Sequence, residues 1–216
     1  MRRAGAAEGR AGAGIILAHG RGGSAADILS LLDHAGLPEV AGFAPEAPGQ
    51  SWWPTSFLAP MAAMQAPLEA GLAAMRKGVA AAEAEGIPRD RIWLGGFSQG
   101  ACLALEAFAR DGDGLAGVLA FSGGLVGTGD AGGAPDEVLY GAHAKRFDYA
   151  GRRDGAKVWI SVHERDPHIP VKRAEDSAAV LRGMGADVRF EVYPGAGHAV
   201  MQMDISAMRG ALNVAA

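Results

Sequence analysis

The segment IWLGGFSQGACLALEAFARDG, residues 92–112, constrains the fold of this 216-residue chain more than any other stretch. It places Ser98 between two glycines, Gly96 and Gly100, at two-residue spacing. A β-branched and aromatic run at 92–94 predicts a strand before the serine, and apolar residues at helical spacing predict a helix after it. A sharp strand-to-helix turn strains the backbone, and the glycines remove side chains that would collide there. The pattern therefore predicts an exposed serine beside a helix N-terminus, which favours developing negative charge.

The same pattern also has an ordinary interpretation as a glycine-rich turn, because the chain contains 33 glycines. The flanking strand and helix favour the functional interpretation, since a nucleophilic serine at such a turn needs both. A serine hydroxyl is nevertheless a weak nucleophile at neutral pH. It requires a base, which the rest of the chain must supply.

Strands and helices alternate along the chain. The predicted strands cover residues 15–18, 40–45, 92–94, 115–121, 157–163 and 188–193. The predicted helices cover residues 24–34, 68–85, 99–112, 171–184 and the stretch from about 201 onward. This alternation predicts an α/β fold with a mostly parallel central sheet that helices cover on both faces. We expect residues 1–216 to form a single domain, with residues 1–12 as a mobile tail.

Composition and charge exclude several classes of protein. A formal net charge of −4 without a basic stripe argues against nucleic acid or an anionic membrane as the main partner. No apolar run approaches the ~18 residues needed to span a bilayer, and the IILA run after the basic N-terminus is too short for a signal peptide. The lone Cys102 fits a reducing compartment and a place in the core. We expect a cytoplasmic protein that needs no cofactor and has no stable membrane anchor.

Ligands of a parallel sheet bind at the carboxyl ends of its strands, so the partners of Ser98 should come from loops at that edge. Two such loops carry suitable side chains, HERDPHIP after the fifth predicted strand and PGAGHAV after the sixth. They predict Asp166 as the acid and His198 as the base, in the chain order serine, aspartate, histidine. Glu164 is the second candidate for the acid.

Each of these side chains has a defined chemical role. His198 would take the proton of the serine hydroxyl as its oxygen attacks a carbonyl, and Asp166 would fix the imidazole tautomer and stabilise the imidazolium. The tetrahedral oxyanion needs two donors that already point at it. The backbone N–H of Gln99 is one, and the N–H of Arg21, in the glycine-rich loop after the first predicted strand, is the other.

Two further patterns resemble ligand-binding motifs but lack the required context. His163, Glu164 and His168 lie close together, yet a helical zinc motif needs its histidines four residues apart, and these are five apart across Pro167. The glycines of residues 127–132 match a dinucleotide fingerprint without opening an apolar helix. We therefore predict neither a metal ion nor a dinucleotide, and we interpret His168 as a pocket-wall or loop-packing residue.

The loop GQSWWPTSFLAP is rich in proline and aromatic residues and connects a predicted strand to a helix. We expect Trp52, Trp53 and Phe57 to overhang the same sheet edge as Ser98, with His168 nearby as a further part of the substrate pocket. An indole also anchors a loop, so the roles of wall and anchor both stay open for the tryptophans. Bulky walls shorten a pocket, so we expect esters of about two to six acyl carbons to be cleaved faster than long ones.

The motifs LAHGRGGSAADIL, LGGFSQGACLALE, FSGG, RDPHIP and YPGAGH follow one another along the chain. Together they resemble the phospholipase/carboxylesterase family of small serine hydrolases, over about residues 14–210. The likeness is to bacterial cytosolic carboxylesterases and, more distantly, to acyl-protein thioesterases. The resemblance implies an α/β-hydrolase fold without a large lid, a triad of Ser98, Asp166 and His198, and oxyanion donors at Arg21 and Gln99. It also allows a homodimer.

Three features depart from the pattern of that family. Arg21 stands where the thioesterases usually have leucine, His163 stands where many members have glycine, and the segment 125–155 is longer than is typical. These departures concern the substrate and not the chemistry. We predict a hydrolase of small carboxylic esters, with thioesterase or lysophospholipase activity on longer acyl chains as the alternative. A catalytically silent binding module is the non-enzyme alternative, and the presence of all three triad residues argues against it.

Overall fold

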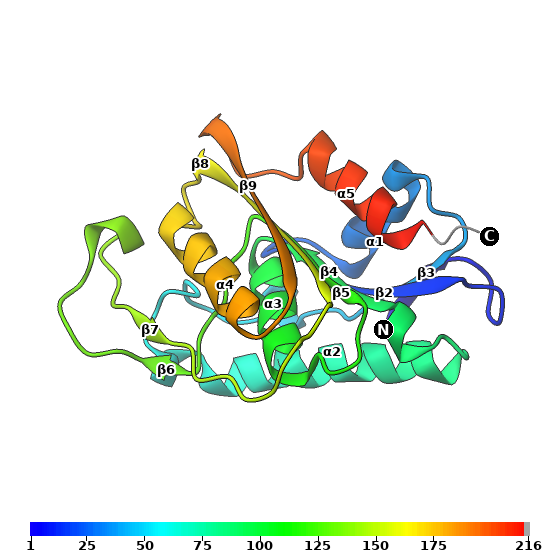
Figure 1. Cartoon of the computed structure of the whole chain (residues 1–216), viewed down its shortest axis with the longest axis horizontal. Coiled ribbons are helices and arrows are strands. Elements are labelled where there is room, and N and C mark those ends of the chain that lie inside the picture. The colour runs from blue at the N-terminus through cyan, green and yellow to red at the C-terminus, as the bar shows by residue number, and fades with distance from the viewer. Residues whose placement is uncertain (214–216) are drawn as a thin grey trace.

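The computed structural model describes residues 1–213, and its centre is a seven-stranded β-sheet (Figure 1). The strands lie in the order β1-β3-β2-β4-β5-β8-β9, and all except β1 run parallel to their neighbours. They span Arg2–Gly5 (β1), Ala13–Ala18 (β2), Val40–Ala44 (β3), Ile92–Phe97 (β4), Gly117–Phe121 (β5), Lys157–Arg165 (β8) and Asp187–Ala196 (β9). The predicted mostly parallel α/β sheet is confirmed.

Five α-helices cover the two faces of this sheet, α1 and α5 on one face and α2, α3 and α4 on the other (Figure 1). They span Ala25–Ala35 (α1), Gln65–Ala84 (α2), Gln99–Asp111 (α3), Val171–Gly183 (α4) and Gln202–Leu212 (α5). The sheet thus separates two apolar cores. Cys102, one turn into α3, is fully buried in the larger core, on the side of α2, α3 and α4.

The local sequence accounts for these elements. All residues of β2, β3 and β5 are buried, because a sheet covered on both faces buries both sides of its central strands. The first helix begins at a capping box, in which the Ser24 hydroxyl accepts from the N–H of Asp27 at 3.2 Å and the Asp27 carboxylate accepts from the N–H of Ser24 at 2.9 Å. It ends at Gly36, whose left-handed backbone (φ 62°) suits a residue without a side chain.

The N-terminus differs from the prediction. Residues placed in a mobile tail form the edge strand β1, which pairs antiparallel with β3. Arg3 donates two hydrogen bonds of 2.6 and 2.7 Å to the carboxylate of Glu85 and lies 5.7 Å from the centre of the Phe43 ring. The sequence RRAG has little strand character of its own, so the pairing depends on β3 and on contacts distant in sequence.

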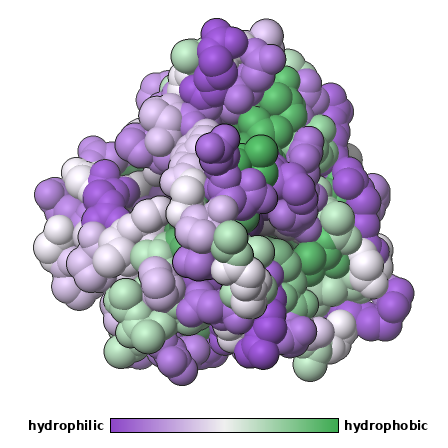
Figure 2. All heavy atoms as spheres, turned by 90° about the vertical axis from the view of Figure 1, so that its left-hand side faces the viewer, coloured by the Kyte–Doolittle hydropathy of each residue, from purple (hydrophilic) through white to green (hydrophobic). Residues whose placement is uncertain are grey.

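Between β5 and β8 the chain leaves the sheet for residues 122–156, which we call the excursion. It contains the two-stranded antiparallel pair of β6 (Gly129–Asp130) and β7 (Lys145–Arg146), and a single 3₁₀ turn at Glu137–Leu139. The excursion extends to one side of the sheet (Figure 1). The face seen from that side is mostly hydrophilic, with apolar side chains in small separate groups (Figure 2). The glycines of residues 127–132 run into β6 and not into the start of an α-helix.

The remaining regular structure consists of short turns in the connections. Single 3₁₀ turns span Pro48–Gln50, Met61–Ala63 and Arg89–Arg91. Within residues 1–213, every helix is too short or too polar to cross a membrane.

Candidate active site

Ser98 lies at the sharp turn between β4 and α3. Its backbone angles, φ 56° and ψ −120°, fall in a region that residues other than glycine rarely adopt. A Cβ on Gly100 would lie 2.0 Å from the carbonyl oxygen of Ala18 in β2, and a Cβ on Gly96 would lie 2.6 Å from the same oxygen. Both glycines are therefore required, because β2 packs directly against the turn.

The carboxyl ends of β4, β8 and β9 bring the three predicted polar side chains together. The Oγ of Ser98 lies 2.8 Å from Nε2 of His198, and Nδ1 of His198 lies 2.8 Å from Oδ2 of Asp166. The three residues follow three different strands of one parallel sheet, whose register places their loops at a common edge. Serine, imidazole and carboxylate thus form one run of hydrogen bonds.

Asp166 is almost completely buried, and its carboxylate accepts three hydrogen bonds. Besides His198, the N–H groups of His168 and Ile169 donate to Oδ1 at 2.8 and 3.0 Å. Burial by itself raises the pKa of this carboxyl, but the hydrogen bonds from these three donors outweigh it, and the pKa lies below its ordinary value. An ionised carboxylate only accepts, so Nδ1 of His198 carries the proton and Nε2 is free to accept from Ser98.

The loop that carries His198 needs its two glycines for different reasons. Gly195 has a left-handed backbone (φ 84°), which glycine adopts without strain. A Cβ on Gly197 would lie 2.6 Å from the imidazole of His163, which is buried under the loop and packs against the ring of Tyr193. His163 therefore supports the loop from the sheet.

Glu164 and His168 lie at the edges of this arrangement. The Glu164 carboxylate is exposed and accepts from the N–H of Gly195 at 3.1 Å, whereas Asp166 is the carboxylate that faces His198. The His168 ring stands edge-on to the His198 ring at 4.8 Å and lines the cavity described below. In the part of the chain that the structure describes, no three His, Cys, Asp or Glu side chains gather as a metal site would require.

The backbone N–H groups of Arg21 and Gln99 are among those near Ser98 that have no acceptor within residues 1–213. Gln99 is the first residue of α3, where the first N–H groups of a helix have no intrahelical partner. Arg21 follows Gly20, at which a Cβ would lie 3.2–3.4 Å from Phe97 and Ser98. The loop after β2 thus runs against the turn, and both residues line the same cavity as Ser98.

The side chains of Arg21 and Gln99 have a second role that the sequence analysis missed. The Arg21 guanidinium donates to the hydroxyl of Ser51 at 3.0 Å and to the carbonyls of Pro54 and Thr55 at 3.2 and 2.5 Å. The Gln99 amide accepts from the N–H of Trp52 and donates to the carbonyl of Trp53, at 2.9 and 2.8 Å. The two residues that present backbone donors thus also hold the aromatic loop in place. No local pattern signals this, because the partners lie far away in sequence.

A cavity of about 1110 Å³ opens beside Ser98 and His198. Trp53 and Phe57 line it, together with the neighbouring residues 54–60. Trp52 instead packs behind this wall, where its indole N–H donates to the carbonyl of His19 at 2.8 Å and its ring lies 5.1 Å from the His19 ring. Its placement in the substrate pocket is corrected to an anchor, because its polar atom is bound to a buried backbone group.

A further part of the cavity lining comes from the excursion, whose role the sequence left open. Asp130, Tyr140, His143 and Lys145 all line the cavity. The Tyr140 hydroxyl donates to the backbone carbonyl of Asp166 at 2.5 Å, so the excursion also contacts the loop of the buried carboxylate. The sequence gives no local signal for this placement of the excursion, since its strands β6 and β7 are only two residues long.

The parallel sheet, the turn at Ser98 and the histidine loop are those of an α/β-hydrolase. The model of the family described as Phospholipase/Carboxylesterase matches residues 5–138. A crystal structure of a phospholipase/carboxylesterase from Dyadobacter fermentans is 38% identical with a TM-score of 0.85, over 98% of this chain and 94% of that one. The chain belongs to the phospholipase/carboxylesterase family, as its motifs suggest.

Other relatives have related names. The crystal structure of esterase PE8 is 25% identical with a TM-score of 0.73, and the match covers 97% of this chain and 95% of that one. Acyl-protein thioesterase 1 of Gibberella zeae is 31% identical over 127 residues, which are 59% of this chain and 49% of the fungal protein. The chain therefore spans about half the length of that thioesterase. This similarity supports membership of the same family, but it does not assign the substrate of the thioesterase to this chain.

Proposed function

We propose that this protein is a serine hydrolase that cleaves carboxylic esters through an acyl-enzyme. The observation that supports this most directly is the run of two 2.8 Å hydrogen bonds from Ser98 through His198 to Asp166, at the wall of a cavity large enough for an ester. Membership of the phospholipase/carboxylesterase family supports the same reaction class. A silent binding module would have no need of a strained serine aligned with a base.

In the first half of the reaction, Ser98 Oγ attacks the ester carbonyl carbon while His198 Nε2 takes the hydroxyl proton. The carbonyl oxygen becomes an oxyanion, which the free N–H groups of Arg21 and Gln99 would bind. Asp166 stabilises the imidazolium through Nδ1–H. His198 then gives its proton to the departing alcohol, which leaves the acyl group on Ser98.

In the second half, water takes the place of the alcohol. His198 Nε2 accepts a proton from the water as its oxygen attacks the acyl carbon, and the same two N–H groups bind the second oxyanion. Ser98 Oγ leaves with the proton from His198. The acid is released and the free enzyme is restored.

Short acyl chains should be preferred, although the volume of the cavity alone does not require it. A volume of about 1110 Å³ lies slightly above the usual range of pockets for small molecules, roughly 300–1000 Å³. The length limit we propose comes from the charged pair Asp130 and Lys145, which lines the same cavity as the apolar side chains of Trp53 and Phe57. A long alkyl chain would have to lie against charged groups. The comparison is the catalytic efficiency on p-nitrophenyl esters from acetate to palmitate, and a steady rise to palmitate would contradict the preference.

A thioesterase is the second candidate, favoured by the names of the fungal relatives. The same groups would attack a thioester carbonyl, with a thiol as the leaving group. Matched butyryl ester and butyryl thioester substrates decide between the two activities. A higher efficiency on the thioester, relative to its faster uncatalysed hydrolysis, would favour the second candidate.

The serine itself provides the test of the proposed function. Ser98→Ala should lower kcat on p-nitrophenyl butyrate by about 10⁶, the loss that follows removal of a triad serine elsewhere. A fluorophosphonate probe should label the wild type and not this variant. Ser122→Ala, at the other serine with a positive φ (53°), is the matched control and should keep both activity and labelling. Equal labelling of Ser98→Ala and the wild type would rule out Ser98 as the nucleophile.

A further inference from the structure

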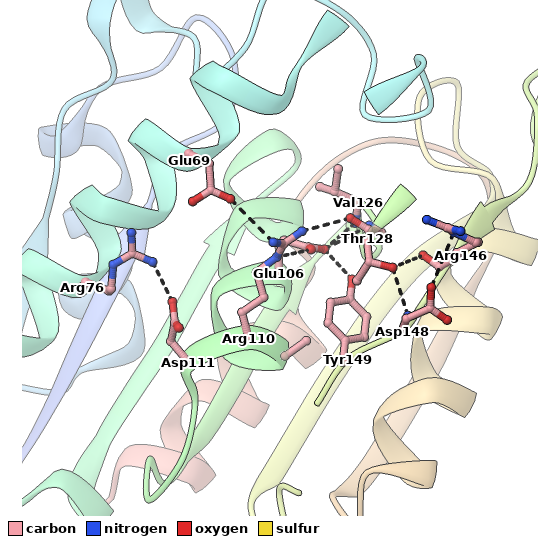
Figure 3. Close-up of polar contacts among 12 residues, drawn as sticks. Glu69, Arg76, Glu106, Arg110, Asp111, Val126, Thr128, Arg146, Asp148 and Tyr149 are labelled. Atoms are coloured by element: carbon pink, nitrogen blue, oxygen red, sulfur yellow. Dashed lines mark hydrogen bonds and ion pairs between the residues drawn. The ribbon is translucent and has the colours of Figure 1, made fainter. Parts of the chain in front are cut away.

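A buried carboxylate of α3, that of Glu106, helps to fasten the base of the excursion (Figure 3). It accepts from the N–H groups of Val126 and Gly127 at 3.0 and 3.1 Å, from the Tyr149 hydroxyl at 2.7 Å and from the guanidinium of Arg110 at 2.7 Å. Residues 126 and 127 belong to the outgoing leg of the excursion and residue 149 to the returning leg. One side chain thus holds both legs.

The two legs are also joined to each other. The N–H of Thr128 donates to the carbonyl of Arg146 at 2.9 Å, and the Thr128 hydroxyl accepts from the N–H of Asp148 at 3.0 Å (Figure 3). The pairing of β6 with β7 continues this contact toward the tip. The excursion is therefore a preorganised wall, because its base and its legs are both tied by buried or backbone hydrogen bonds.

This wall presents an ion pair to the cavity. Lys145 and Asp130 face each other across the β6–β7 pair, and both line the cavity beside Ser98. The ammonium of Lys145 also donates to the carbonyl of Ala59 at 2.5 Å, and the Asp130 carboxylate accepts from the N–H of Met61 at 3.0 Å. An ammonium has three hydrogens. Within residues 1–213, the acceptors of the Lys145 ammonium are the carbonyl of Ala59 and the carboxylate of Asp130. One N–H remains on the Lys145 side chain, which is 1% exposed, next to a carboxylate that is 39% exposed.

We infer that the Lys145–Asp130 pair binds a hydroxyl group of the substrate, so that the esters this enzyme prefers carry a hydroxyl away from the scissile bond. A hydroxyl donates and accepts at once, so it can accept from the ammonium and donate to the carboxylate. The inference rests on the proposed ester hydrolysis and adds the substrate class. An alkyl chain at the same place would displace water from the exposed Asp130 carboxylate without replacing its hydrogen bonds.

A carboxylate on the substrate is the competing ligand, and the geometry disfavours it. It could accept from Lys145, but it would lie beside the Asp130 carboxylate, which stays ionised because the hydrogen bond from Lys145 lowers its pKa. Two carboxylates in contact repel. A hydroxyl avoids this repulsion, since it brings no charge to a pair that is already neutral.

The test compares esters that differ only in hydroxyl groups. Glyceryl 1-monobutyrate and propyl butyrate differ in the alcohol part, and ethyl 6-hydroxyhexanoate and ethyl hexanoate differ in the acyl part. In the wild type, at least one hydroxylated ester should have a kcat/KM about tenfold above its partner, as one added hydrogen bond of ordinary strength gives. Lys145→Met and Asp130→Asn should each bring that ratio close to one. Lys157→Met, which removes a surface lysine paired with Asp187, should keep the wild-type ratio.

Binding to the Ser98→Ala variant separates this inference from the proposed function. Calorimetry of the same esters with that variant measures hydroxyl recognition without chemistry, so an inactive wild type would not hide it. Melting temperatures of the two cavity variants identify any that fail to fold, and Lys145→Arg, which keeps the charge, should retain part of the ratio. Ratios near one in the wild type, in both hydrolysis and binding, would overturn the inference. So would a preference for 3-(butyryloxy)propanoate, which would assign the pair to an anion.

Discussion

Two regions of the molecule meet at the cavity, the loops that follow β4, β8 and β9 and the excursion between β5 and β8. The first region takes its geometry from the sheet, because parallel strands in register bring Ser98, Asp166 and His198 to one edge. The second region lies outside the sheet and takes its geometry from polar anchors such as Glu106. The lining of the same cavity is thus fixed partly by the pairing of the central sheet and partly by polar anchors and the short β6–β7 pair of the excursion.

Because the two regions are held in place differently, we expect changes in them to affect different properties of the enzyme. The loops at the sheet edge carry the groups proposed for bond breaking, so changes there should act on the rate for every ester. The excursion carries groups that contact the rest of a substrate, so changes there should act on selectivity and on stability.

The largest of these effects belongs to the acid at the sheet edge. Asp166→Asn should lower kcat by about 10⁴, because an asparagine no longer fixes the tautomer of His198. Glu164→Gln is the matched control and should cost less than about tenfold, since its carboxylate accepts from the N–H of Gly195 and not from His198. The measurement is kcat on p-nitrophenyl butyrate. If Glu164→Gln were the more damaging change, the acid would have to be reassigned.

An intermediate effect is expected at the base of the excursion. Glu106→Ala should lower the free energy of unfolding by about 3 kcal/mol, because it leaves the buried N–H groups of Val126 and Gly127 without an acceptor and removes the nearest carboxylate from Arg110. Glu69→Ala removes an exposed carboxylate 3.6 Å from the same Arg110, and should change stability by less than about 0.5 kcal/mol. Urea unfolding measures both. Equal losses would mean that Glu106 does not fasten the excursion.

The smallest effects concern pH, and the two regions should respond in opposite directions. Burial raises the pKa of Glu106 above its ordinary value of 4.5, despite the opposing charge of Arg110. Its contribution to stability is therefore full below pH 4.5 and declines as pH rises through the raised pKa. The pKa of Asp166 lies below its ordinary value of 3.8, so its contribution is full above pH 3.8 and is lost as pH falls through the lowered pKa.

Unfolding free energies at several pH values test these signs. The advantage of the wild type over Glu106→Gln should shrink as pH rises above 4.5, and its advantage over Asp166→Asn should shrink as pH falls below 3.8. Parallel curves for the two variants would contradict the assignment of opposite shifts.

The comparison also explains how far the sequence could predict the structure. The helices and the parallel strands follow from periodicity, and the positions of Ser98, Asp166 and His198 follow from the rule that ligands meet the carboxyl ends of parallel strands. The glycines at 96 and 100 signal a close approach of another strand, which the structure identifies as β2. Each of these inferences rests on local sequence and on one topological rule.

The remaining features rest on contacts between residues far apart in sequence. Strand β1 exists because β3 offers it an edge, Trp52 is an anchor because the carbonyl of His19 accepts its N–H, and Lys145 reaches the cavity because β6 and β7 pair. None of these contacts has a periodicity or a motif. These contacts can be identified only once the three-dimensional structure is known. The whole excursion is held in place by contacts of this kind.

Because Cys102 is buried, the native chain should not react with thiol labels. The pKa of its thiol is raised to about 12 by burial, so at pH 7 only about one molecule in 10⁵ carries the reactive thiolate. A single cysteine introduced at Val138, a residue 55% exposed at the tip of the excursion, would therefore take up a maleimide fluorophore by itself. The emission of that dye would then report on the excursion in the wild-type background, before and after a substrate analogue occupies the cavity.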